Sequence, residues 1–212
     1  MGMKRKKQLS SVIFHAGACI LGFFMIYPLL WLLASSFKSN ETMFTNTYSL
    51  LPEVWDAAKN YASGFAGIGG VAFSTFFMNS MVVTVVGTIT CVLSSLLAAY
   101  TFSRLKFRFS NFWFGCVMMT MMIPAQVMVV PQYIILKKIQ LIDTRVALVL
   151  PWCFGGAFFI FLMVQFFQGI PKELDEAAEI DGCGKIQTLV RVLIPIVRPA
   201  IITSSIFAFY WI

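Results

Sequence analysis

The stretch EAAEIDGCGKIQTLVRVLIP, residues 176–195, lies between two long apolar runs and is unlike the rest of the chain. It carries five ionisable residues, although only 12% of the whole chain is Asp, Glu, Lys or Arg. Two alanines follow Glu176, two glycines come soon after them, and a proline closes the stretch. The pattern predicts two short polar helices joined by a tight turn and held between membrane spans.

The composition around this stretch excludes most soluble folds. Of the 212 residues, 59% are hydrophobic, whereas a soluble domain is about half apolar and about a quarter charged. The chain therefore has too little polar surface to cover a water-soluble globule, and a polytopic membrane protein is expected. We predict an all-α transmembrane helical bundle.

Apolar runs divide the chain into spans and connecting segments. The first run is too long for the apolar part of a cleavable signal peptide, and residues 38–70 are expected to form an external loop with one short surface helix. The final run has 13 residues, about 20 Å of helix against a hydrocarbon core of roughly 30 Å, so we expect an incomplete fifth span. The apolar runs cover residues 8–37, 73–102, 111–136, 146–168 and 200–212.

Basic residues gather next to the spans, which argues against nucleic-acid binding and indicates contact with lipid headgroups. If the N-terminus is inside, the inside segments hold eleven Lys and Arg residues and the outside segments hold five. This asymmetry favours a cytoplasmic N-terminus and places residues 169–199 in the cytoplasm.

The residues that would perform chemistry are scarce. The first four spans contain no Asp, Glu, Lys or Arg, which argues against a membrane enzyme and against a proton-driven transporter. His15 is the only histidine and is interpreted as structural. No catalytic residue, metal ligand or cofactor is predicted. An odd number of cysteines without a CxxC pair indicates small core residues: Cys19, Cys91, Cys116, Cys153 and Cys183.

The segment GIPKELDEAAEIDG, residues 169–182, has the features of a short helix. Pro171 suits a first helical position, acids in the first turns favour the helix dipole, and Gly182 suits the C-terminal turn. Small side chains allow close approach of a partner, and acids can pair with its basic groups. At about 100° per residue, one arc holds a low ridge of Leu174, Ala177, Ala178 and Asp181.

A second short helix is predicted over residues 185–194, ended by Pro195, and Pro199 is expected to start the next span. A helix lying on the bilayer would have a broad apolar face and basic residues. The first helix is instead acidic and narrow, so docking onto a partner protein is favoured.

The sequence GCGKI, residues 182–186, is a poor match to a phosphate-binding loop. That loop needs glycine where Glu179 stands and Ser or Thr where Ile186 stands. The carboxylates of Glu179 and Asp181 would also repel phosphate. We therefore expect no nucleotide to bind at this loop.

The spacing in this stretch resembles the EAA motif of membrane subunits of ABC importers. That motif is EAA, three residues, Gly, nine residues and I-x-L-P, and here Val192 and Ile194 replace its Ile and Leu. Sequences such as MMIPAQVMVVPQYIILKKIQLIDTRVALVLP are similar to the maltose-type carbohydrate permeases, and the likeness covers about residues 72–212. The resemblance implies a type I permease with six spans in the full chain. It also implies ATPase-coupling roles for Glu176, Ala177, Ala178, Asp181, Gly182 and Pro195.

The resemblance implies a permease subunit that carries a sugar across the bacterial cytoplasmic membrane and performs no chemistry. The implied partners are an ABC ATPase subunit dimer, a second permease subunit, an extracellular or periplasmic solute-binding protein and membrane lipid. A permease for a polyamine, amino acid, glycerol phosphate or oxyanion is the closest alternative, and a non-transporting structural subunit is another. Residues 1–71 are expected to hold the tail, first span and external loop, and residues 72–212 an incomplete transport domain with its coupling segment at 169–199.

Uncharged spans suit a neutral substrate. The polar candidates for its path are Asn79, Ser80, Thr84, Thr120, Gln126 and Gln165. Such groups also hold helices together through hydrogen bonds of about 0.6–2 kcal/mol each, and that alternative is favoured for most of them individually. Pro124 and Pro131 lie near one face of the third span, either as a bend used in gating or as kinks required by packing.

Overall fold

The computed structural model describes residues 3–45, 49–52 and 54–212, and it describes side chains from Lys7 onward. The expected basic cluster at residues 4–7 therefore lies outside the described side chains, except for Lys7. Every named element in the described part is a helix, which confirms the all-α prediction. The chain divides into two compact units, Met1–Phe77 and Met78–Ile212.

The elements of the first unit are α1 (Met3–Ser35), α2 (Asn40–Thr45), α3 (Ala57–Ala66) and the start of α4 (Phe73–Arg104). The second unit continues from α4 with α5 (Ser110–Thr120), α6 (Ala125–Lys138), α7 (Arg145–Val149), the 3₁₀ turn η1 (Leu150–Phe154), α8 (Ala157–Gln168), α9 (Glu173–Ile180), α10 (Lys185–Thr188), the π-helical turn η2 (Leu189–Leu193), α11 (Ile194–Ile196) and α12 (Arg198–Trp211).

The first unit consists of the apolar α1 and a folded loop at its end. The loop holds two short helices, α2 and α3, where the sequence predicted one. Asn60 on α3 donates hydrogen bonds from Nδ2 to the carbonyl oxygens of Ser36 at 3.1 Å and Lys38 at 2.7 Å. These carbonyls follow the end of α1, where no further helical turn can pair with them, so the amide group ties the loop to the helix.

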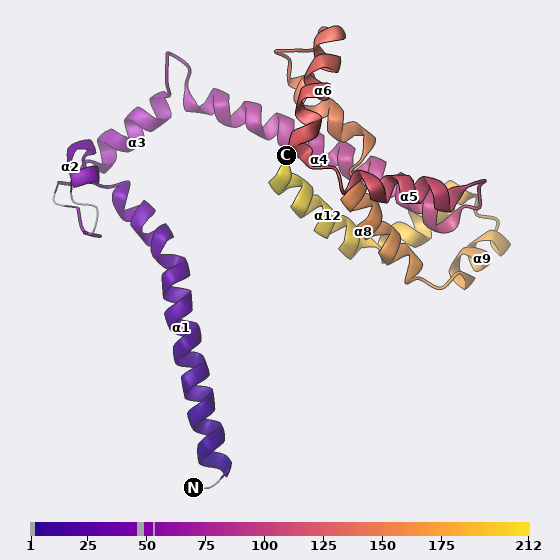
Figure 1. The fold of residues 1–212 in the computed structure, drawn as a ribbon, viewed down its shortest axis with the longest axis horizontal. Helices are drawn as coiled ribbons and strands as arrows, with labels where there is room; N and C mark the ends of the chain where they lie inside the picture. The colour runs from indigo at the N-terminus through magenta and orange to yellow at the C-terminus, as the bar shows by residue number, and fades with distance from the viewer. Residues whose placement is uncertain (1–2, 46–48, 53) are drawn as a thin grey trace. The chain divides into compact units, whose positions relative to one another are not determined.

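The core of the second unit forms between α4 and α8, and both α5 and α12 pack against α8 (Figure 1). Its buried residues recur at helical spacing, so each helix turns one stripe inward. Ser95 accepts a hydrogen bond from the Gly156 amide at 3.1 Å, a close approach that small residues permit. The buried stripes are Cys91, Val92, Leu96, Ala99 and Tyr100 on α4, and Phe159, Ile160, Met163, Val164 and Phe167 on α8.

Three described helical stretches are long and apolar enough to cross a bilayer: Lys7–Ser35, Phe73–Arg104 and Arg145–Gln168. They agree with the predicted first, second and fourth spans. Two bent helix pairs could each supply one further span.

The predicted third span, residues 111–136, is not one straight helix. It is broken into α5 and α6, whose axes differ by 100°. The break lies before Pro124, which lacks an amide hydrogen and disfavours helical geometry at Ile123. Pro131 lies inside α6 without ending it. Of the two prolines expected to bend this span, only Pro124 coincides with the break.

The predicted helix at residues 185–194 also differs from the structure, because helical backbone continues through Pro195 to Ile196. The turn before the proline is π-helical, and the Ile194 amide donates to the Leu189 carbonyl, five residues earlier. This wider turn relieves the clash that a proline ring makes with the carbonyl four residues before it. The chain then bends by 79° into α12, and Pro199 lies in the first turn of that helix, as predicted.

Candidate functional site

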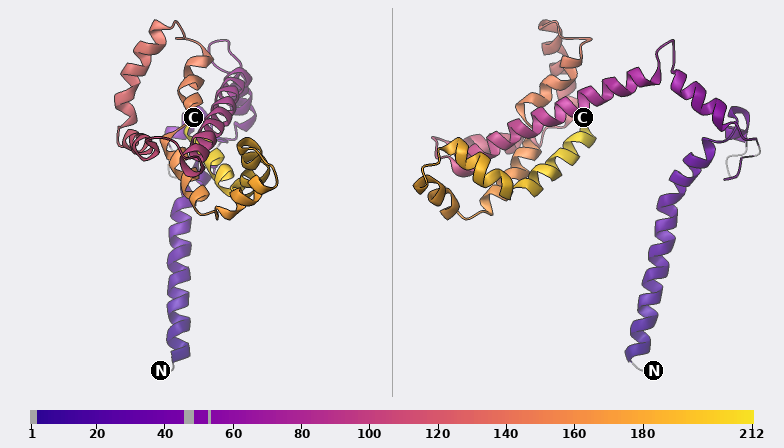
Figure 2. Two further views of the ribbon diagram at one scale, coloured as in Figure 1. Left: turned by 90° about the vertical axis from the view of Figure 1, so that its right-hand side faces the viewer. Right: turned by 180° about the vertical axis from the view of Figure 1, so that it is seen from behind.

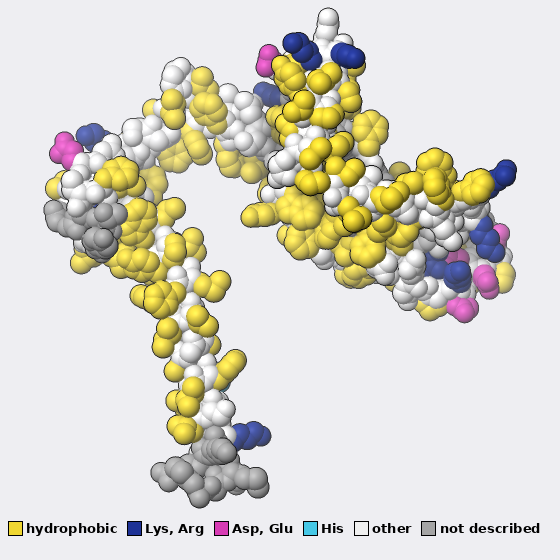
Figure 3. All heavy atoms as spheres, in the orientation of Figure 1, with side chains coloured by type: hydrophobic (Ala, Val, Ile, Leu, Met, Phe, Trp, Pro, Cys, Tyr) yellow, Lys and Arg dark blue, Asp and Glu magenta, His cyan; other side chains and the backbone are white. Residues whose placement is uncertain are grey.

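Residues 176–195 fold into most of α9, a turn, α10, η2 and the start of α11, and α9 and the turn after it lie at one end of the second unit (Figure 2). Acidic and basic side chains gather at this end, whereas α5 and α6 are covered mainly by hydrophobic side chains (Figure 3). Residues 169–199 are therefore one charged part of the second unit, and a second charged group lies at the end of α6 and in the turn after it, at Lys137, Lys138, Asp143 and Arg145.

Local chemistry accounts for the start of α9. Glu173, Asp175 and Glu176 occupy its first turn, where negative charge is favourable to the helix dipole, as predicted. Pro171 was expected at the first helical position, but the helix begins at Glu173. The carbonyl of Lys172 accepts the amide hydrogens of Asp175 and Glu176 at 2.9 and 3.2 Å, so the first helical hydrogen bonds start after the proline.

Gly182 ends α9 in a left-handed conformation, with φ of +81°. The Gly182 amide donates to the Glu179 carbonyl at 3.0 Å, and the Cys183 amide donates to the Ala178 carbonyl at 2.9 Å. These two bonds form a Schellman motif, which satisfies carbonyls at the end of the helix and reverses the chain. The role expected for Gly182 as a sharp turn therefore has a structural basis.

The face of α9 that could meet a partner differs from the predicted ridge. Ala178 is only 5% exposed and packs into the chain itself, whereas Ala177, Glu176 and Asp181 are exposed. The reason is the neighbouring Asp175, which is drawn inward by a cation and brings Ala178, three residues later, onto the inner face. Ala178 is therefore not available as part of an outer docking ridge.

Two isoleucines that are not among the predicted site residues are prominent on the outside of the segment. Ile180 is 86% exposed and Ile186 is 77% exposed, one on each side of the Gly182 turn. Their large apolar side chains in an otherwise polar stretch are the sequence feature by which they could have been predicted. Pro195 is also exposed, but it lies beyond the π-helical turn rather than in the α9–α10 turn.

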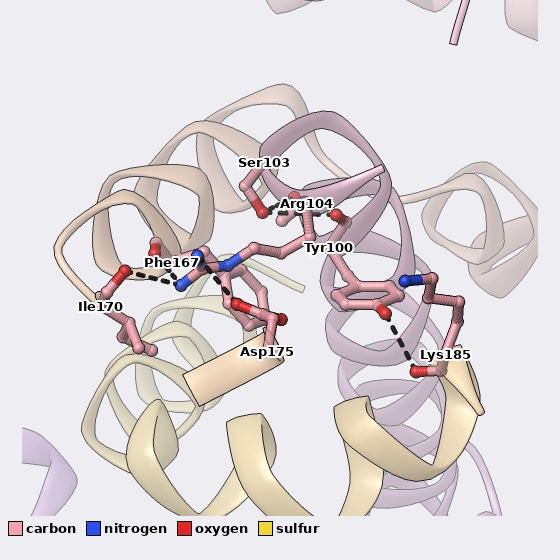
Figure 4. Close-up of polar contacts among 8 residues, drawn as sticks. Tyr100, Ser103, Arg104, Phe167, Ile170, Asp175 and Lys185 are labelled. Atoms are coloured by element: carbon pink, nitrogen blue, oxygen red, sulfur yellow. Dashed lines mark hydrogen bonds and ion pairs between the residues drawn. The ribbon is translucent and has the colours of Figure 1, made fainter. Parts of the chain in front are cut away.

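The inner side of the segment is held by residues of α4 (Figure 4). Arg104 places Nη1 3.0 Å from Asp175 Oδ2, and its Nη2 donates to the carbonyls of Phe167 at 2.7 Å and Ile170 at 2.9 Å. Tyr100 donates its hydroxyl to the Lys185 carbonyl at 2.9 Å. Arg104 was expected only as one of the basic residues next to the spans, and no role was predicted for Tyr100.

The polar residues expected along a substrate path are only partly brought together. Asn79, Ser80 and Thr84 line one pocket with residues 143–145. Thr120 lines a different pocket beside α8, Gln165 lies near Ile196, and Gln126 follows the bend at Pro124. In the part of the chain that the structure describes, no group of three His, Cys, Asp or Glu residues could hold a metal ion.

Comparison with known proteins places this architecture in a family. Residues 91–212 match the family described as the binding-protein-dependent transport system inner membrane component. The chain is 35% identical over 185 residues to a probable ABC transporter permease protein, YurM, of Bacillus subtilis, covering 87% of this chain and 60% of that protein. It is 31% identical over 202 residues to the diacetylchitobiose uptake system permease protein NgcG of Streptomyces coelicolor, covering 94% and 65%. The chain thus spans less than two thirds of the length of these relatives.

Among solved structures, the fold resembles a chain of a bacterial ABC transporter involved in the import of the acidic polysaccharide alginate. The TM-score is 0.84 at 24% identity, covering 97% of this chain and 71% of that chain. This likeness supports the fold of a multi-pass membrane protein. The family match over more than half of its residues shows that the chain belongs to the binding-protein-dependent transport system inner membrane components.

Proposed function

We propose that the chain is a permease subunit of an ABC importer that carries a mono- or oligosaccharide across the bacterial cytoplasmic membrane. The observation that carries the proposal is the coupling segment, a polar helix ended by a left-handed glycine and exposed at one end of an apolar helical unit. The names of relatives, among them NgcG and an arabinooligosaccharide transport system permease protein of Halalkalibacterium halodurans, support a sugar.

The proposed partners are those that membership of this family implies. A permease without a nucleotide site needs an ABC ATPase dimer, and the α9–α10 turn is the proposed contact. Within α9 and this turn, Glu176, Ala177, Asp181 and Gly182 form the outer part and Ala178 supports it from inside. A second permease subunit would complete the path, and a solute-binding protein outside the membrane would deliver the sugar. Residues 72–212 form the proposed transport domain, following a tail, span and external loop at residues 1–71.

The proposed topology places the N-terminus and the coupling segment in the cytoplasm. We expect Cys183, in a variant lacking the other four cysteines, to react with an impermeant maleimide only after the cells are permeabilised. Ser63→Cys, on the exposed side of α3, is the matched position and should react in intact cells. Strong labelling of Cys183 from outside intact cells would contradict this topology.

The proposed substrate is tested by uptake. Proteoliposomes holding the complete complex with its binding protein are expected to accumulate at least one of labelled glucose, maltose, arabinobiose or diacetylchitobiose when ATP is supplied. The physical reason is the lack of Asp, Glu, Lys and Arg in the predicted spans, which suits a neutral solute. Accumulation of labelled spermidine, an amino acid, glycerol phosphate or sulfate, with no response to any sugar, would show that the permease serves another solute.

A further inference from the structure

Arg104, at the end of α4, contacts one carboxylate and two backbone carbonyls. Its side chain is 5% exposed, and it reaches two carbonyls at the end of α8 as well as Asp175 on α9. A planar guanidinium can serve several acceptors at once, whereas a lysine ammonium acts as a single point charge. The arrangement therefore joins three helices through one side chain (Figure 4).

Tyr100 lies one helical turn before Arg104 and contacts the coupling segment on the other side of the Gly182 turn. Its hydroxyl donates to the Lys185 carbonyl at 2.9 Å, and its ring lies 6.2 Å from the ring of Phe167. Residues four apart share one face of a helix. One face of α4 thus contacts the coupling segment before Ala177 and again after Gly182.

The ion pair of Arg104 differs from the other ion pair in the segment. Lys185 lies 3.2 Å from Glu179, but both side chains are about two thirds exposed, so this pair contributes little. Arg104 is nearly fully buried and Asp175 is 23% exposed, so loss of either partner leaves a charge with poor access to water. The carbonyl contacts also help to compensate the desolvation of Arg104, as does its place at the C-terminal end of α8.

We propose that Arg104 is a positioning residue that fixes α9 to α4 and α8, so that displacement of the coupling segment is passed directly to α4. This inference rests on the proposed coupling role of α9. The opposite end of α4 carries Asn79, Ser80 and Thr84, and Ser80 lies about 36 Å of helix away from Arg104. Through a rigid connection at Arg104, a displacement of α9 by the ATPase would also move α4 and the polar residues at its opposite end.

The test uses the complete transporter in proteoliposomes, with Ser80→Cys as the reporter in a variant of this chain lacking its other cysteines. The measured quantities are the rate of ATP hydrolysis and the change in maleimide labelling of position 80 on adding ATP and vanadate. We expect Arg104→Gln and Asp175→Asn to keep ATPase association and hydrolysis, and to reduce the ATP-dependent change in labelling by about ten-fold, a typical allosteric coupling factor.

Two further variants separate positioning from a general effect of charge or folding. Lys106→Gln removes an exposed positive charge two residues from Arg104 and is expected to behave as the parent. Asp175→Glu keeps the negative charge and should restore most of the labelling change. Asp175→Asn leaves the carbonyl contacts of Arg104 in place, so it tests the link to α9 while α8 stays supported.

Limited trypsin digestion gives an independent measure of the link, because Lys172 and Lys185 flank α9 and are exposed. Cleavage at these lysines should be faster in Arg104→Gln and Asp175→Asn than in Lys106→Gln. Unchanged labelling and digestion in the first two variants would overturn the inference, as would a parent complex whose labelling does not respond to ATP. A parent chain that fails to bind any ATPase would instead overturn the proposed function.

Discussion

Ala178→Leu is expected to displace α9 from the rest of the chain, whereas Ala177→Leu should leave the fold unchanged. Ala178 is 5% exposed, and α9 contacts the π-helical turn η2 on its inner side. A leucine there adds three carbon atoms to a filled space, and overpacking of this kind costs about 1–3 kcal/mol. The apparent melting temperature of the solubilised chain and the rate of trypsin cleavage at Lys172 and Lys185 measure the effect.

The adjacent alanine is the matched control because the substitution is the same and only the direction of the side chain differs. Ala177 is exposed, so Ala177→Leu should keep the melting temperature and the trypsin pattern of the parent. If α9 docks onto an ATPase by its outer face, Ala177→Leu should still weaken co-purification of that subunit. Equal loss of thermal stability in both variants would contradict the assignment of Ala178 to the inside and Ala177 to the outside.

Much of the architecture could be predicted because it depends on local chemistry. In a bilayer, the backbone N–H and C=O groups of a long uncharged apolar run must form hydrogen bonds with one another, and a helix allows this. The helices at Lys7–Ser35 and Phe73–Arg104 therefore agree with the first two predicted spans. The acids at the start of α9 and the glycine at its end likewise act within one or two turns. Their positions in the sequence were enough to predict the helix and the turn.

The orientation of α9 could not be predicted because it is set by a distant residue. The contacts of Arg104 and Tyr100 are made to residues 63 to 85 positions further along the chain. Helical periodicity gives the angle between the side chains of Ala177 and Ala178 around the helix axis, but it does not show which of the two faces the rest of the protein. Arg104 pairs with Asp175 on the inner side of α9, and Ala178, three residues later, lies on that side instead of on the predicted outer ridge.

Pro124, which was expected to bend the third span, and Pro195, which was expected to end a helix, show a similar limit. Pro124 breaks the third predicted span, whereas Pro195 lies within continuous helical backbone. The same residue type therefore has opposite outcomes. The difference comes from the preceding turn, which is π-helical before Pro195, and packing of Leu189 and Leu193 into the core accompanies that wider turn.

Gly182→Thr is expected to disrupt the turn after α9, although there is open space for a Cβ atom at this position. No heavy atom lies within 4 Å of a Cβ built on Gly182, so the effect would come from the backbone alone. A β-branched residue is strongly disfavoured at φ of +81°, and strain of this type costs about 1–3 kcal/mol. The Schellman hydrogen bonds should weaken, and trypsin cleavage at Lys185 and loss of the co-purified ATPase should both increase.

Gly184→Thr is the matched control, because Gly184 is equally open but has φ of −71° and ψ of 163°, which any residue adopts. It also precedes α10 as the N-cap, a position where threonine and glycine are about equally favourable. Gly182→Asn should recover much of the parent behaviour, since asparagine tolerates the left-handed region better than other residues. If Gly182→Thr and Gly184→Thr change trypsin cleavage and ATPase co-purification equally, the backbone conformation at Gly182 does not shape the coupling segment. If only Gly182→Thr changes them and Gly182→Asn restores the parent values, the left-handed turn is what presents α9 to its partner.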